Sequence, residues 1–177
     1  MIRRLILLYF CIVTISCSSQ SKKSDMGLLQ PDAKVIELYG KPISEIIFGA
    51  ERVEIMSVQL FSSSKDQKKT KKPFETLEKV VLNSESQAII KFLICNYDNY
   101  TSEVSNNRCS FVPMMALQFV NNQNHFTIYY SDGCNMFGFL NGKELDYISL
   151  NPNIKSSLIK FAKSFFPNDP YIRTLKP

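Results

Sequence analysis

The chain has 177 residues, of which 45% are hydrophobic and 21% are charged. This composition is typical of a globular protein and excludes a disordered or collagen-like chain. The length fits one domain with short appendages. Because the chain contains a single histidine, it cannot build zinc sites from several histidines or relays between histidines.

The charge balance gives no reason to expect a nucleic-acid partner. Lysine and arginine number 21 against 16 acidic residues, a net charge of +5. Arg3 and Arg4 precede an N-terminal apolar run, and without them the net charge falls to about +3. Domains that bind nucleic acid usually carry a much stronger basic excess on one face. We therefore expect no nucleic acid among the partners.

The N-terminus has the layout of a secretory signal. Two arginines precede the apolar run 5–15, and small residues follow it. A membrane-spanning helix needs about 20 apolar residues, so this run is too short to span a bilayer. The residues Thr14-Ile15-Ser16-Cys17 then resemble the lipobox of bacterial lipoproteins.

The lipobox resemblance implies a lipid anchor at Cys17. In that family the signal, here residues 1–16, is cut before the cysteine, whose thiol receives a diacylglyceryl group and whose new amine is acylated. Each buried CH₂ contributes about 0.8 kcal/mol, so several acyl chains hold a protein firmly to membrane lipid. Ser18 follows where an inner-membrane retention aspartate would stand, which favours the outer membrane of a bacterial envelope. Thr14 departs from the usual Leu, and a plain secretory peptide cut within 16–19 is the alternative.

Residues 17–30 are rich in Ser and Lys and are expected to form a flexible tether to a single domain, 31–177. At the start of that domain, 31–39 is predicted to be a short helix ended by Gly40, with Pro42 beyond it. Strands are predicted at 52–61, with a bulge near Ile55, and at 76–82.

The lysine-rich run 65–72 separates these two strands. It is predicted to be a solvated hairpin tip, and the alternative is a contact with anionic lipid or glycan. After the second strand, Ser84 and Gln87 match a capping box and predict a helix start. The apolar side of that helix is predicted to carry five residues: Ala88, Ile89, Phe92, Leu93 and Cys95. Residues 96–110 are polar and are expected to form a loop.

The stretch 111–150 predicts a four-stranded antiparallel meander, because short apolar runs alternate with turn sequences. A short turn centred on Asn122-Gln123 would place Leu117 opposite Ile128 and Phe119 opposite Phe126 on neighbouring strands. An Asp132-Gly133 turn would place Ile128 opposite Phe137. The predicted buried face consists of Leu117, Phe119, Phe126, Ile128, Phe137, Phe139, Leu145 and Tyr147.

The register of the last strand depends on the turn at Asn141-Gly142. A two-residue turn there would place Asp146 opposite Phe137, which is unsuitable for a core. A three-residue loop with Gly142 as a left-handed bulge residue instead pairs Phe137 with Tyr147. We therefore predict the longer loop.

Asn151-Pro152 predicts the start of a last helix, and Pro167 its end. Its apolar positions are Ile154, Leu158, Phe161, Ala162 and Phe165. The two main helices are expected to pack against the antiparallel sheet, which gives an α+β fold.

Three cysteines remain in the mature chain if Cys17 is lipidated. Cys95 is expected to be a small core residue. Cys109 and Cys134 are predicted near the same end of the sheet, where a disulfide is one alternative and two free thiols the other. A catalytic Cys134–His125 pair is disfavoured because the two residues lie at opposite ends of their strands.

No motif predicts a catalytic residue, a metal site or a cofactor. The chain contains neither a Gly-x-Ser-x-Gly elbow nor a CxxC pair, and Asp98 and Asp132 are isolated in turn sequences. One mixed apolar face of the meander is a candidate interaction face for an envelope protein, with coverage by the rest of the fold as the alternative. Its candidate residues are Tyr129, Met136, Leu140 and Ile148.

These patterns predict an envelope-anchored lipoprotein that is a non-catalytic binding or interaction module. An envelope inhibitor or immunity-type protein is a narrower alternative. A thiol-dependent enzyme is the second alternative, with Cys109, Cys134 and the loop 96–110 as its candidates.

Overall fold

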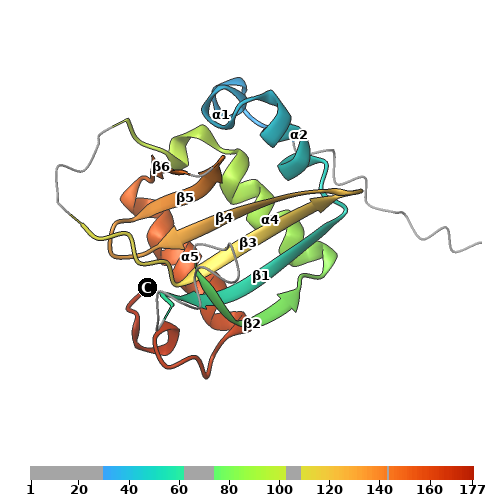
Figure 1. Ribbon diagram of the computed structural model, residues 1–177. Coiled ribbons are helices and arrows are strands. Elements are labelled where there is room, and N and C mark those ends of the chain that lie inside the picture. Colours follow the sequence, from blue (N-terminus) through green and yellow to red (C-terminus); the bar gives the residue numbers. More distant parts are fainter. Residues whose placement is uncertain (1–29, 62–73, 103–108, 143) are drawn as a thin grey trace, which may run out of the picture.

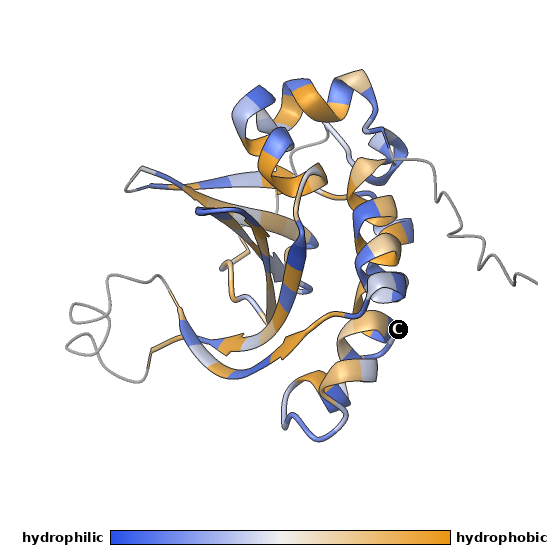
Figure 2. Ribbon diagram, turned by 90° about the vertical axis from the view of Figure 1, so that its right-hand side faces the viewer, coloured by the Kyte–Doolittle hydropathy of each residue, from blue (hydrophilic) through white to orange (hydrophobic). Residues whose placement is uncertain are grey.

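The computed structural model describes residues 30–61, 74–102, 109–142 and 144–177 (Figure 1). The predicted signal peptide, Cys17, nearly all of the tether and the lysine-rich run 65–72 lie outside these residues. The described part has the predicted α+β class: one six-stranded antiparallel sheet with helices on one of its faces (Figure 2). That face is called the helix face below, and the other face the second face.

The strand order is β2-β1-β3-β4-β5-β6, and every pair of neighbours is antiparallel. The strands are β1 (Arg52–Gln59), β2 (Glu75–Val81), β3 (Met115–Asn121), β4 (Asn124–Ser131), β5 (Met136–Asn141) and β6 (Glu144–Ser149). The helices are α1 (Ala33–Tyr39), α2 (Lys41–Phe48), α4 (Ser84–Cys95) and α5 (Pro152–Phe165), with the short 3₁₀ helices η1 (Tyr97–Asn99) and η2 (Ile172–Thr174).

Helix α1 is confirmed, but the chain after Gly40 differs from the prediction. Gly40 has a φ of 79°, and a second helix, α2, begins directly after it. Pro42 lies in the first turn of α2. Proline is tolerated there because the N–H groups of the first turn have no partner within the helix. The Gly-x-Pro sequence therefore separates two helices and does not begin a loop.

Helix α4 begins one residue earlier than predicted and buries a different side. Its N-cap is Asn83, whose side chain accepts a hydrogen bond of 2.8 Å from the Ser86 N–H. Ile90, Ile94 and Cys95 are buried, whereas Ile89 and Phe92 are exposed. Because α4 is apolar around most of its circumference, periodicity alone could not decide which side faces the sheet.

Strand β1 is buried on both faces of the sheet. The predicted bulge near Ile55 is wrong. The register shift lies on β2, where Leu77 is the extra residue between the pairs Ser57–Glu78 and Val58–Thr76. Apolar residues of both parities in β1 thus reflect burial from both sides and not a bulge.

The meander β3–β6 is confirmed, and its β3–β4 register is as predicted. Leu117 pairs with Ile128 and Phe119 with Phe126. Between β4 and β5 the connection has four residues, so Ile128 pairs with Phe139. The predicted β4–β5 pairing is therefore wrong by two residues. A shift of two preserves which side chains share a face, so both phenylalanines of β5 still lie in the core.

The predicted register of β6 is wrong by one residue, which exchanges its two faces. Phe137 pairs with Ile148 and Phe139 with Asp146. Ile148 is consequently in the main core, whereas Tyr147 is half exposed and Leu145 packs on the second face. The structure tolerates Asp146 on the helix face because β6 is an edge strand and the Asp146 carboxylate accepts a hydrogen bond of 2.8 Å from the Asn141 side chain.

Helix α5 has the predicted Asn151 cap, with Pro152 as its first residue. Its predicted apolar positions are buried, apart from the half-buried Phe165. Together with α1, α2 and α4, this helix covers the aromatic helix face of the sheet and closes the main core.

Candidate functional site

The four predicted interaction residues do not form one open face. Ile148 lies on the helix face, inside the main core. Tyr129 lies on the second face and is buried beneath Phe74, with ring centroids 4.8 Å apart. Met136 is half-buried, and Leu140 is exposed. The alternative of coverage by the fold itself therefore holds for Tyr129, and no continuous apolar strip joins the four side chains.

Cys109 and Cys134 are joined by a disulfide, and their Cα atoms lie 5.7 Å apart. Cys95 is free and buried, and burial raises the pKa of its thiol. A raised pKa keeps the thiol protonated at neutral pH, which is the opposite of what a nucleophilic cysteine requires.

His125 is an exposed residue of β4, beside the turn at Asn122-Gln123. Cys134 lies beyond the other end of the same strand, so the two side chains do not meet. Among residues 30–61, 74–102, 109–142 and 144–177, no group of three or more His, Cys, Asp or Glu side chains is placed to hold a metal ion. Asp98 is exposed in η1, whereas Asp132 is buried.

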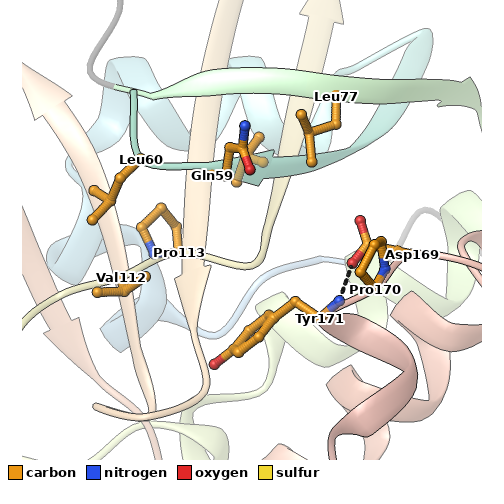
Figure 3. A pocket seen from close by; sticks show the side chains of 9 residues that line it. Gln59, Leu60, Leu77, Val112, Pro113, Asp169, Pro170 and Tyr171 are labelled. Atoms are coloured by element: carbon orange, nitrogen blue, oxygen red, sulfur yellow. Dashed lines mark hydrogen bonds between the residues drawn. The ribbon is translucent and has the colours of Figure 1, made fainter. Parts of the chain in front are cut away.

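An apolar groove of about 360 Å³ lies at the end of the sheet where β1 ends and β2 begins (Figure 3). Three chain segments form its walls: the β1–β2 pair, the residues before β3, and the C-terminal segment after α5. The lining residues are Val58, Gln59, Leu60, Leu77, Val112, Pro113, Asp169, Pro170 and Tyr171. In Figure 3, Gln59 and Leu77 face the C-terminal segment across the gap.

The C-terminal wall of the groove is fixed by side-chain hydrogen bonds within the segment and to helix α5. The Asp169 carboxylate accepts from the N–H groups of Tyr171 and Ile172, each at 2.9 Å. The Lys163 ammonium of α5 donates to the Leu175 carbonyl at 2.6 Å. These bonds place the Tyr171 ring along the base of the groove (Figure 3).

Tyr171 also ties this wall to the sheet, because its hydroxyl donates to the Asp132 carboxylate at 2.9 Å. Burial, then the hydrogen bond to Asp132 and the charge of that carboxylate, raise the pKa of Tyr171 to about 12. The Lys155 ammonium donates to the Asp132 backbone carbonyl at 2.9 Å. Asp132, expected from sequence to be an isolated turn residue, thus links the sheet to the C-terminal segment.

The disulfide holds the opposite wall at the same end of the sheet. Cys109 lies shortly before Val112 and Pro113 in sequence, and Cys134 lies two residues after Asp132. One covalent bond therefore ties together the two segments that carry Val112-Pro113 and Asp132. The groove walls are thus held in place without a bound ligand, as in many preformed binding sites.

The groove combines an apolar lining with two polar side chains. Most of its lining is aliphatic, proline or aromatic, and two polar side chains, Gln59 and Asp169, contribute to it. The Gln59 amide donates to the Glu75 carboxylate at 2.9 Å, and Asp169 caps the chain that follows it. These side chains can orient a ligand but present no nucleophile with an adjacent base.

The sequence did not predict the groove, because its three walls come from segments that lie far apart in the chain. The sequence contains only a weak indication of the groove: Leu60, Val112 and the Pro170-Tyr171 pair are apolar residues outside any predicted core position.

Comparison with protein families, curated proteins and solved structures found no match for this chain. Within the described residues, no helix is long and apolar enough to cross a bilayer.

Proposed function

We propose that this protein is an envelope-anchored lipoprotein whose folded domain is a non-catalytic binding module, and that the groove at the β1–β2 end is its binding site. The observation that carries the proposal is the groove itself: an open apolar surface framed by three segments that a disulfide and side-chain hydrogen bonds hold in place. Apolar clefts of a few hundred Å³ with a few oriented polar groups are the usual form of binding sites.

The exposed side chains at the groove favour a partner over further packing within the chain. Leu60 and Leu77 are each about half exposed, at 51% and 50% of their surface. Leaving such side chains in water forgoes part of the roughly 1.5–3 kcal/mol that full burial of a leucine contributes. Covering them with a partner would recover that free energy.

The anchor part of the proposal is supported by the sequence of residues 3–17. An acylated Cys17 would hold the domain to membrane lipid through the tether 17–30 and restrict it to encounters at the membrane surface. Binding in two dimensions raises the effective concentration of a partner in the same envelope, so modest affinity at the groove would suffice.

Site-specific photo-crosslinking in intact cells tests the groove as the binding site. A photoreactive amino acid at Leu77 is expected to capture one protein in a reproducible adduct. The matched control is Tyr147, which is equally exposed but lies on β6 at the opposite edge of the sheet. If Leu77 gives no adduct, or the same adducts as Tyr147, the groove is not the binding site.

A further inference from the structure

We infer that the groove receives an extended peptide segment of a partner protein, which adds as a strand to the free edge of β2 and places an aliphatic side chain, flanked by Lys or Arg, in the groove. This inference rests on the proposed function and specifies the chemistry of the partner.

β2 is an edge strand of the sheet, and most of it is exposed. At the other edge, β6 is followed by a bridge between Leu150 and Tyr100, and the Thr101 N–H donates to the Ser149 carbonyl at 3.1 Å. The outer side of β6 is therefore partly occupied by the chain's own backbone. The outer side of β2 receives no strand from the described residues. Edge strands with free backbone groups are the usual docking sites for extended peptides.

The hydrogen-bond pattern identifies which groups of β2 point outward. The Leu82 N–H donates to the Val53 carbonyl at 2.9 Å, so Leu82 faces β1. In an antiparallel ladder the direction alternates from residue to residue. Val80 therefore also bonds to β1, whereas the backbone groups of Lys79 and Val81 face away from the sheet. Val81 is 56% exposed, so its side chain does not obstruct this edge.

The bulge on β2 connects the free edge with the groove. Leu77 is the extra residue at the bulge, and its side chain lines the groove from the β2 side (Figure 3). A strand added beside β2 has side chains that alternate between the two faces of the sheet. The side chains of the added strand that point to the helix face would lie next to Leu77 and above Pro170 and Tyr171. An aliphatic side chain there would bury the exposed leucine surface.

The charge of the site selects a basic segment. Glu78 of the edge strand and Asp169 of the groove wall both carry carboxylates, and no ion pair with either is formed within the described residues. The one lysine of β2, Lys79, is paired instead with the buried Glu54 carboxylate at 3.1 Å. A Lys or Arg beside the aliphatic anchor would complement these two negative charges.

A peptide selection against the full chain in detergent tests the inference. The probe is a randomised hexapeptide library, and selected peptides are expected to combine an aliphatic residue with Lys or Arg. The affinity of the leading peptide is then measured for three variants. Val81→Pro removes an outward N–H and should weaken binding about fivefold or more. Val81→Ala keeps the N–H and should bind within about twofold of the parent protein. Asp169→Asn keeps the cap but removes the charge, and should weaken binding most at low salt.

A second measurement keeps the test independent of how Val81→Pro folds. N-methylation of the leading peptide at alternate positions removes its own strand-pairing donors and leaves the protein unchanged. One set of alternate positions should abolish binding and the other should not, because only one set faces β2. Equal effects of the two sets, or no effect of either, would overturn strand addition.

The crosslinking and N-methylation results together distinguish a failure of strand addition from a failure of the groove as the binding site. A specific photo-adduct at Leu77 together with peptides insensitive to N-methylation would mean that the groove binds a partner in another way, and the inference alone fails. No adduct and no selected peptide would mean that both fail.

Discussion

At the residue scale, the Tyr171–Asp132 hydrogen bond joins the C-terminal segment to the sheet. The change Tyr171→Phe removes the donor and leaves a buried Asp132 oxygen without its partner. A loss of about 1–3 kcal/mol in the free energy of unfolding is expected for such a group. Urea unfolding at pH 7 measures it, with Tyr147→Phe as the matched control. Equal stabilities of the two variants would mean that this hydrogen bond contributes nothing.

The raised pKa of Tyr171 predicts that the contribution of this residue to the free energy of unfolding depends on pH. The folded state raises the pKa of Tyr171 from its ordinary value of 10.0 to about 12, chiefly through burial. The protonated phenol is thus favoured by folding, so its contribution is complete below pH 10 and is lost as the pH rises through 12. The stability difference between the parent protein and Tyr171→Phe should therefore shrink over this range. Urea unfolding at pH 9 and pH 11.5 measures the change, and a constant difference would contradict it.

Gly138 of β5 is required because the Phe111 ring lies against it. A Cβ at this position would lie 2.6 Å from the Phe111 ring, and that ring also packs on Phe74 and Tyr147. The change Gly138→Ala should cost about 1–3 kcal/mol through overpacking. The matched control is Gly133→Ala, where a Cβ would meet no atom within 4 Å. Thermal unfolding of the two variants measures the difference, and similar melting temperatures would show that Phe111 moves aside freely.

At the element scale, the start of α4 distinguishes the structure from the sequence-based prediction. The structure places the cap at Asn83, one residue before the predicted Ser84. Asn83→Ala should therefore cost about 0.5–2 kcal/mol, and Ser84→Ala much less. Chemical unfolding of the two variants measures this. A larger loss for Ser84→Ala would place the helix start at the predicted position.

The elements that sequence predicted well are those with one unambiguous pattern. α5 has a capping Asn-Pro pair and a clear apolar stripe, and β3 and β4 are joined by a short turn that fixes their register. α4 is apolar on most sides, so its buried side depends on what the sheet offers. The predicted register of β6 is wrong because it keeps Asp146 off the helix face. On an edge strand, however, water can solvate the Asp146 carboxylate, and the Asn141 side chain donates a hydrogen bond to it.

At the scale of the whole molecule, the second face and the groove depend on contacts between distant segments. Phe74 lies outside every predicted strand and helix, and Phe111 is only the first residue of the predicted meander, yet they cover Tyr129 and Gly138. The C-terminal segment beyond Pro167 carries no periodic pattern and still forms a wall of the groove. Such contacts are fixed by the packed fold, and local propensity does not encode them.

We propose that the whole molecule is a folded binding domain on a lipid anchor. The described domain presents a preformed groove, and the sequence before it resembles a lipoprotein signal. Only when both parts are present would a groove of modest affinity act efficiently on a partner in the same membrane system.

The most direct test is mass spectrometry of the mature N-terminus after membrane fractionation of the native host. The proposed lipid anchor predicts an N-terminal peptide that begins at Cys17, carries a diacylglyceryl group on sulfur and an acyl group on the amine, and is found in the membrane fraction. A water-soluble protein that begins at Ser18, or one that retains Met1 without lipid, would contradict it.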